Sequence, residues 1–247
     1  MGASDRALRW ESLLNARDFG GLPAAHGHVR PGAIVRSDAL YRLNDAGRAA
    51  LIAHGVRTVI DMRTPNEVAA NPYAFDPASG VVQQGIPQQT DEMWRPFAGK
   101  ADRLTFDTAM LQLGRANFVA IAQAIANAPD GGVLIHCEVG KDRTGLMTML
   151  LLDLVGTPAE VIAADYGLTA SGLAPLFADL IAKAESEERR TRLQEEARCR
   201  AEVMDRIHAS FRSHHGDAEM YLRLGGASKE TIDAIRSRML DRASPTT

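Results

Sequence analysis

The stretch GGVLIHCEVGKDRTGLMTMLLLDLVG (131–156) decides the fold, because its character changes twice along its length. Residues 131–136 form a continuous apolar run of the kind that buried parallel strands show. From residue 143 onward the stretch has the composition of a buried helix. The segment CEVGKDR therefore connects the carboxyl end of a strand to the amino end of a helix. Proteins with parallel sheets bind ligands at this position, where the free N–H groups and the dipole of the helix favour an anion.

The side chains of this connecting segment suit a phosphate group. The positive surroundings favour a thiolate at Cys137, the form that attacks phosphorus to give a cysteinyl phosphate. Arg143 can bind two phosphate oxygens with its planar guanidinium, and Lys141 adds a second positive charge. The Thr144 hydroxyl can donate to the sulfur when sulfur leaves, and Gly140 allows a backbone conformation that other residues resist. The predicted phosphate-binding residues are Glu138, Val139, Gly140, Lys141, Asp142, Arg143 and Thr144.

Two carboxylates are candidates for the general acid. Asp142 lies beside the expected phosphate, whose charge favours the protonated carboxyl group, so Asp142 can protonate the leaving group and then activate water. Asp61 ends the neighbouring predicted strand, 57–63, and can face the same crevice. An ion pair with Arg63 or a cap on the next helix would also explain Asp61. His136 is better suited to bracing the loop by hydrogen bonds than to acting as a base.

Strand and helix patterns alternate through the first part of the chain. Strands are predicted at 32–37, 57–63, 81–87 and 131–136. Helices are predicted at 44–55, from Thr64 with a capping box completed by Glu67, and at 105–127, with a loop at 88–104. From 143 onward the chain is predicted to be helical, with breaks at 156–157, 169–172 and 216. This alternation predicts an α/β fold with a central, mostly parallel sheet flanked by helices.

We predict a single domain over 1–247. An α/β core occupies about 1–157 and contains the phosphate loop at 136–145. A helical part at about 158–247 is expected to cap the sheet and is a candidate for a lid. Within it, ESEERRTRLQEEARCR (185–200) fits a solvated helix held by charge pairs, with a mobile lid or partner surface as the alternative.

The composition narrows the class of protein. The chain has 247 residues and a net charge of -3, which gives no basic field for binding nucleic acid. Two cysteines, Cys137 and Cys199, cannot form a disulfide framework, and Cys199 in the charged helix is interpreted as incidental. The N-terminus MGASDRALRW has no signal-peptide core, and GLMTMLLLDLVG is too short to span a bilayer. We expect a cytoplasmic monomer without integral membrane association, metal or cofactor, although export by a non-classical route stays open.

Other interpretations of the loop fit less well. A Walker-type nucleotide loop needs Gly-(x)4-Gly-Lys-Ser/Thr, but Asp142 follows Gly140-Lys141, and Ile135 occupies the position of the first glycine. Sulfurtransferases and arsenate reductases also place a cysteine in an anion loop, but no second cysteine is expected near enough to Cys137 to resolve an intermediate. A buried structural thiol would not need the charged residues that follow. A catalytically inactive phosphate-binding module on the same fold stays as the alternative to a hydrolase.

The sequence His-Cys-x-x-Gly-Lys-x-Arg-Thr-Gly at 136–145 resembles the signature of cysteine-dependent phosphatases. Its Lys-Asp pair resembles the bacterial tyrosine phosphatase family of broad specificity, whose fold is of the dual-specificity type. Further segments similar to that family are NARDFGGLP (15–23), GAIVRSDALYRLNDAGRAAL (32–51), VIDMRTPNEV (59–68), VIAADYGLT (161–169) and AEMYLRLGGAS (218–228). The resemblance implies hydrolysis of phosphotyrosine without a metal, and in several relatives it extends to phosphoserine, phosphothreonine and phosphoinositides.

The resemblance also implies roles for individual residues. Cys137 would be the nucleophile, Arg143 the phosphate binder and Asp142 the acid of the loop. Lys141 matches the lysine associated with phosphoinositide recognition. The substrate would then be a phosphorylated protein or a phospholipid.

Two departures from the family pattern matter. Glu138 adds a negative charge at the rim, where lipid-directed relatives often carry neutral or basic residues, and this weakens the expectation for phosphoinositides. The Trp-Pro-Asp acid loop of many tyrosine phosphatases is missing. The segment DEMWRPFAGKAD (91–102) contains these residue types without the contiguous motif, which makes Asp91 and Asp102 weak candidates for the acid.

Overall fold

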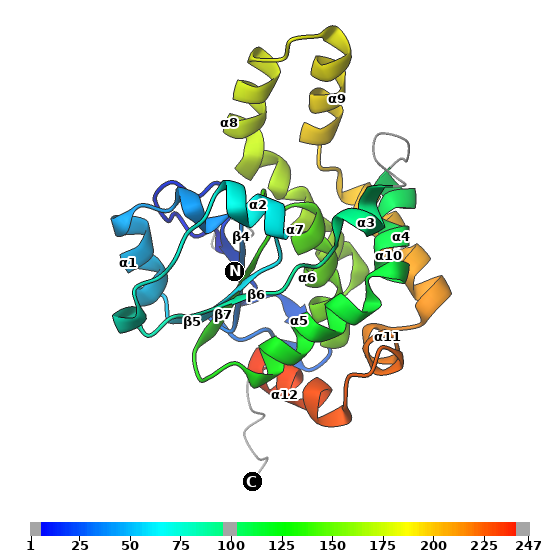
Figure 1. Ribbon diagram of the computed structural model, residues 1–247. Coiled ribbons are helices and arrows are strands. Elements are labelled where there is room, and N and C mark those ends of the chain that lie inside the picture. Colours follow the sequence, from blue (N-terminus) through cyan, green and yellow to red (C-terminus); the bar gives the residue numbers. More distant parts are fainter. Residues whose placement is uncertain (1–5, 96–102, 241–247) are drawn as a thin grey trace.

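The computed structural model describes residues 6–95 and 103–240, and a five-stranded sheet lies at its centre (Figure 1). The strand order is β1-β4-β7-β5-β6; β1 runs antiparallel to β4, and the other neighbouring strands are parallel. The strands are β1 Arg17–Asp18, β4 Ile34–Ser37, β5 Val56–Asp61, β6 Val82–Gly85 and β7 Gly132–His136. A separate small hairpin joins β2 Pro23–Ala24 and β3 Gly27–His28. The predicted α/β fold with a mostly parallel sheet is confirmed.

The described helices follow the predicted pattern with local differences. Their bounds are α1 Asp45–Ala53, α2 Pro65–Ala70, α3 Asp91–Trp94, α4 Arg103–Leu113, α5 Arg115–Asn127, α6 Asp142–Leu154, α7 Ala159–Gly167, α8 Thr169–Ala182, α9 Glu187–Ala197, α10 Ala201–His215, α11 Ala218–Leu224 and α12 Lys229–Met239. The capping box at α2 is confirmed, because the Thr64 side chain accepts from the Glu67 N–H and the Glu67 carboxylate accepts from the Thr64 N–H.

Several predicted boundaries are wrong, and the breaks at 183–186, 198–200 and 225–228 were not predicted. The loop at 88–104 contains α3, which the Thr90 hydroxyl caps by accepting from the Met93 N–H, and it overlaps the start of α4. The helix at 105–127 is divided at Gly114, where a Cβ atom would lie 2.7 Å from the Met110 carbonyl oxygen. The break at 169–172 lies inside α8, and the chain turns one residue earlier, at Leu168.

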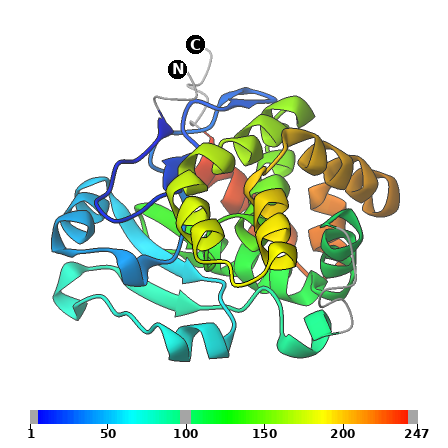
Figure 2. The same cartoon turned by 90° about the horizontal axis from the view of Figure 1, so that it is seen from above.

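Side chains of the three central strands alternate between two apolar cores, as the strand period of two requires. One core contains Ile34, Ile60, Val133 and Ile135 together with residues of α5, α6 and α10. The other core contains Val35, Val59 and Leu134 together with Leu51 of α1. Most helices of the C-terminal half therefore cover one face of the sheet, and α1 covers the other (Figure 2). This double burial explains the continuous apolar runs of the central strands.

Helices α8 and α9 form a hairpin that extends beyond α7 (Figure 1). Its small core contains Leu173, Phe177 and Leu193, and Val139 of the phosphate loop packs against that core. The charged segment at 185–200 is helical through α9, with pairs such as Arg190–Glu187, as predicted. By length and composition alone, Ala159–Ala182 is apolar enough to cross a membrane, although α7 within it packs into the core of the fold.

Candidate active site

Three strands end at the same edge of the sheet, and the phosphate loop starts there. β7 ends at His136, which is in register with Ser37 at the end of β4 and with Asp61 at the end of β5. Cys137 follows directly and is 2% exposed. The candidate nucleophile thus lies where the carboxyl ends of three parallel strands converge, the position that ligands occupy in such sheets.

The loop can take its shape only with glycine at position 140. Gly140 has a φ of +66°, and a Cβ atom there would lie 2.3 Å from the Ser37 carbonyl oxygen. Helix α6 begins two residues later, at Asp142. The free N–H groups of its first turn therefore lie beside the loop and favour an anion.

Side chains from two distant segments orient the peptide groups of the loop. The Asn15 amide donates to the carbonyl oxygens of Val139, at 3.2 Å, and Gly140, at 3.0 Å. Arg36 Nη2 donates to the same Gly140 oxygen at 2.8 Å. Because a carbonyl and the following N–H of a planar peptide point in opposite directions, the N–H groups of Gly140 and Lys141 face away from these partners. Convergent N–H groups of this kind form an anion nest.

A buried cluster of charges lies behind this bracing. Asp165 of α7 accepts from Arg6 Nη2 at 2.9 Å, Arg17 Nε at 3.2 Å and Arg36 Nη1 at 2.8 Å. Burial opposes ionisation of Asp165, but the arginines hold the pKa of its carboxyl group well below its ordinary value. Burial lowers the pKa of Arg36 to about 10, and Arg17 adds to this effect. Three guanidinium groups around one carboxylate leave surplus positive charge next to the loop. Sequence reasoning did not detect this cluster, although Arg17, Arg36 and Asp165 lie in segments that resemble the phosphatase family.

Arg143 forms a two-point ion pair with Glu67 of α2. Nη1 donates to Oε2 at 2.5 Å, and Nη2 donates to Oε1 at 2.6 Å. Burial would lower the pKa of Arg143, but the Glu67 carboxylate outweighs it and raises that pKa above its ordinary value. Burial likewise would raise the pKa of Glu67, and the bonds from Arg143 lower it instead. The sequence indicated Glu67 only as part of a helix cap.

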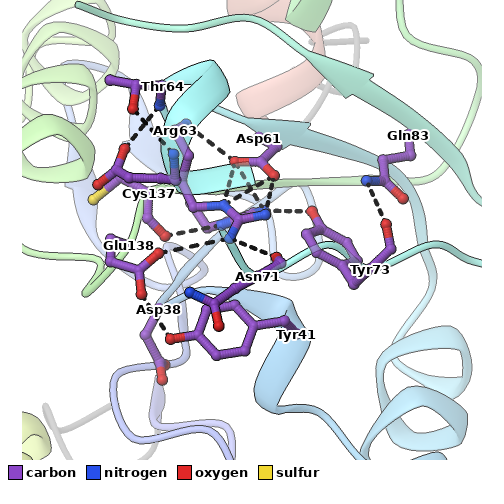
Figure 3. A network of polar contacts seen from close by, with 12 residues as sticks. Asp38, Tyr41, Asp61, Arg63, Thr64, Asn71, Tyr73, Gln83, Cys137 and Glu138 are labelled. Carbon is purple, nitrogen blue, oxygen red and sulfur yellow. Dashed lines mark hydrogen bonds and ion pairs between the residues drawn. The ribbon is translucent and has the colours of Figure 1, made fainter. Parts of the chain in front are cut away.

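Asp61 is held by Arg63 at the end of β5 (Figure 3). Arg63 Nε donates to Oδ1 at 3.0 Å and Nη2 donates to Oδ2 at 2.8 Å. Burial would raise the pKa of Asp61, but these hydrogen bonds keep that pKa below its ordinary value. The ion pair that sequence analysis gave as the other explanation for Asp61 is therefore present.

His136 braces the start of the loop, as predicted. Its Nδ1 lies 3.0 Å from the Cys137 carbonyl oxygen, which can only accept, so Nδ1 carries the proton. Its Nε2 then accepts from the Tyr73 hydroxyl at 2.6 Å. Burial lowers the pKa of His136, which keeps the ring neutral. A neutral ring with both nitrogens bonded is a structural support and is not available as a base.

Lys141 and Glu138, the two residues that bear on phosphoinositide recognition, both form polar contacts with other residues of the protein. Lys141 Nζ donates to the Glu196 carbonyl oxygen at the end of α9, at 2.7 Å, and lies 5.8 Å from the centre of the Phe177 ring. Glu138 Oε1 accepts from the Tyr41 hydroxyl at 2.6 Å, and Arg42 lies 3.5 Å from the same atom. The lysine therefore ties the α8–α9 hairpin to the phosphate loop.

Asp142 borders a small cavity beside Arg143. Tyr166 donates from its hydroxyl to Asp142 Oδ1 at 3.3 Å. The cavity has a volume of about 170 Å³ and is lined by Gln88, Gln89, Phe106, Asp107, Met110, Asp142, Arg143 and Leu146. A larger cavity of about 720 Å³ next to α10 is lined by no residue of the loop. Asp102 lies outside the described residues, and the structure places only the backbone of Asp91, in α3.

Cys199 does not lie in the charged helix, which corrects the sequence-based placement. It follows α9, is buried, and has a φ of 36°. Its Sγ lies 3.7 Å from the Glu196 carbonyl oxygen that also binds Lys141. Burial raises the pKa of the Cys199 thiol, and Lys141 offsets part of this effect.

Within 6–95 and 103–240, no group of three or more His, Cys, Asp or Glu side chains is arranged to hold a metal ion. The strand–loop–helix unit with Cys137 and Arg143 defines the class of cysteine-dependent phosphatases. A family model described as "Tyrosine phosphatase family" matches residues 8–241. The chain therefore belongs to the tyrosine phosphatase family and is a phosphomonoester hydrolase.

Two curated relatives agree with this assignment. A tyrosine-protein phosphatase of Nostoc commune is 34% identical over 218 residues, which cover 84% of this chain and 74% of the relative. The triple specificity protein phosphatase PtpB of Mycobacterium tuberculosis is 28% identical over 259 residues, which cover 86% of this chain and 92% of the relative. The similarity thus extends over both the sheet and the helical part.

Proposed function

We propose that this tyrosine phosphatase works through Cys137, Arg143 and Asp142. The Cys137 thiolate attacks phosphorus and the ester P–O bond breaks, while Asp142 donates its proton to the leaving oxygen. Water then attacks the cysteinyl phosphate, Asp142 takes a proton from that water, and the P–S bond breaks to return the thiolate. The observation that carries this proposal is the position of Cys137 and Arg143 on one anion-binding loop at the sheet edge.

Thr144 supports the second step. Its Oγ1 is buried and has no hydrogen-bond partner. A buried hydroxyl without a partner is costly, and a role at a reacting centre explains its retention. Donation to the departing sulfur would satisfy the hydroxyl.

The choice of Asp142 over Asp61 rests on what each carboxylate contacts. Asp61 is fixed by Arg63 and its pKa lies below the ordinary value, so it has no proton to give near neutral pH. Asp142 borders the cavity beside Arg143, where a leaving group or water can be placed. Asp142 is therefore the better candidate for the acid.

Replacement of Asp142 by asparagine is expected to lower kcat by about 10²- to 10⁴-fold and to remove the basic limb of the pH–rate profile. The limb arises because the acid must be protonated, so the rate falls as the pH rises through its pKa. Asp61→Asn is the comparison: it is expected to retain the basic limb, whatever its effect on stability. Profiles of kcat for both variants test the assignment, and an unchanged profile in Asp142→Asn would refute it.

We propose phosphotyrosine in proteins as the main substrate, with phosphoserine and phosphothreonine as further substrates. The name of the mycobacterial relative supports breadth of specificity. The engagement of Lys141 with Glu196, and the negative charge of Glu138, count against phosphoinositides. Assays of phosphotyrosine and phosphoserine peptides and phosphoinositides, side by side with EDTA present, test this order; loss of activity with EDTA would indicate metal-assisted hydrolysis instead.

Lys141→Met is expected to lower activity on phosphotyrosine peptides and phosphoinositides in parallel. The reason is that the ammonium group holds the hairpin, so its loss should destabilise the protein by about 1.5–3 kcal/mol and make α9 more sensitive to trypsin. Lys183→Met, which removes an exposed lysine of the same hairpin, is the matched control. A selective loss of phosphoinositide hydrolysis would show that Lys141 binds a second phosphate.

A cytoplasmic location and a monomeric state stay predictions. Hydrolysis of an artificial aryl phosphate by the unmodified chain is the direct measurement of the proposed activity.

A further inference from the structure

The ion pair between Arg143 and Glu67 includes a third participant, the cap of α2. Thr64 donates its backbone N–H to Glu67 Oε2 at 2.8 Å, and this oxygen also accepts from Arg143 Nη1. The Thr64 hydroxyl in turn accepts from the Glu67 N–H at 3.3 Å. The Glu67 carboxylate is therefore held by the backbone of its own helix cap as well as by the Arg143 guanidinium.

The edge of Arg143 that Glu67 occupies determines which edge is left for phosphate. A guanidinium is planar and has five N–H groups. Glu67 takes one N–H from each terminal nitrogen, which is the end of the fork. The Nε–H and the N–H beside it on one terminal nitrogen stay parallel along the side of the fork. That edge can bind two phosphate oxygens while Glu67 remains bound.

We propose that Glu67 is a positioning residue, which uses the capping box of α2 to hold Arg143 with the side edge of its guanidinium directed at the phosphoryl group. This inference rests on the proposed function of Arg143. The pair of Arg143 and Glu67 has no net charge, so it adds little attraction for a free phosphate ion. Glu67 contributes by orienting Arg143. This orientation matters most in the transition state, when the equatorial oxygens of the phosphoryl group spread apart.

The variant Glu67→Gln removes the two-point ion pair with Arg143 and keeps the capping box of α2. Glutamine also completes a capping box, so α2 keeps its start. Its amide nitrogen, however, would face an N–H group of Arg143 and cannot accept, so the two-point pair is lost. The matched control is Glu160→Gln, which makes the same substitution at an exposed carboxylate in the first turn of α7.

We expect Glu67→Gln to lower kcat on an aryl phosphate by about 10- to 100-fold, with a KM within about threefold of the unmodified protein. Affinity for vanadate, which adopts the transition-state geometry, should fall by a similar factor, and affinity for inorganic phosphate should change little. The basic limb of the pH–rate profile should persist. In an Arg143→Ala background, Glu67→Gln should have no further effect on kcat.

Several outcomes would overturn the inference. A kcat unchanged from the active parent, an equal loss of phosphate and vanadate affinity, or a full additional loss in the Arg143→Ala background would each refute positioning through Arg143. Circular dichroism of Glu67→Gln and Glu160→Gln checks that both are folded. An unmodified chain that fails to hydrolyse the aryl phosphate would refute the proposed function itself, which distinguishes the two failures.

Discussion

Replacement of Cys137 by serine is expected to abolish hydrolysis of both aryl phosphates and phosphotyrosine peptides, with a loss in kcat of at least about 10⁴-fold. A serine hydroxyl stays protonated where a thiol can ionise, and His136 is neutral, bonded through both ring nitrogens and unable to activate it. Phosphate binding should persist, because the loop N–H groups and Arg143 are unchanged. Steady-state kinetics in EDTA and calorimetric titration with phosphate measure the two properties.

The second cysteine provides a matched control for this experiment. Cys199→Ser removes a buried thiol that lies near Lys141 but belongs to the turn after α9. Activity within about twofold of the unmodified protein is expected, because no step of the proposed mechanism uses this thiol. Substantial turnover by Cys137→Ser would contradict the cysteinyl-phosphate mechanism, and a large loss in Cys199→Ser would show that the second thiol takes part.

The parts of the fold that local sequence determines could be predicted. The apolar run of β7, the glycine-containing turn and the apolar α6 are adjacent in the chain, so their order alone places Cys137 at the edge of the sheet. The capping box at Thr64 was equally local, since both partners lie within four residues. Predicted positions failed where packing decides, as at Gly114, where the side chains of Met93 and Gln88 lie 3.1 and 3.3 Å from the position that a Cβ atom would take.

The partners of the loop could not be predicted, because they come from distant segments. Asn15 and Arg36 reach the loop from positions more than 100 residues away, and neither forms a pattern with it. Glu67 had a sufficient local explanation as a cap, so nothing in the sequence indicated its second partner. Lys141 had an expected role toward the substrate, and only the position of α9 shows that its ammonium group binds a helix end.

Asp165→Asn is expected to destabilise the protein more than Lys141→Met does, by about 3–5 kcal/mol in the free energy of unfolding. The substitution keeps the shape of the side chain but leaves three buried guanidinium groups without their counter-charge. Urea unfolding measures the effect, and Asp179→Asn, in an exposed pair with Lys183, should change stability by no more than about 1 kcal/mol. Adding Arg6→Gln to Asp165→Asn should restore part of the loss, because it removes one of the uncompensated charges.

The pH dependence of this loss follows from the direction of the pKa shift. The folded-state pKa of Asp165 is lowered, so its contribution is fully present above the unfolded value near 3.8 and disappears only as the pH falls through the lower folded value. The difference between the unmodified protein and Asp165→Asn should therefore be constant from about pH 5 to 8 and shrink only in stronger acid. A difference that instead changed near neutral pH would mean that another titrating group compensates the arginines. Because Arg36 joins Asp165 to the Gly140 carbonyl, loss of this charge should also loosen the phosphate loop, so phosphate affinity should fall together with stability.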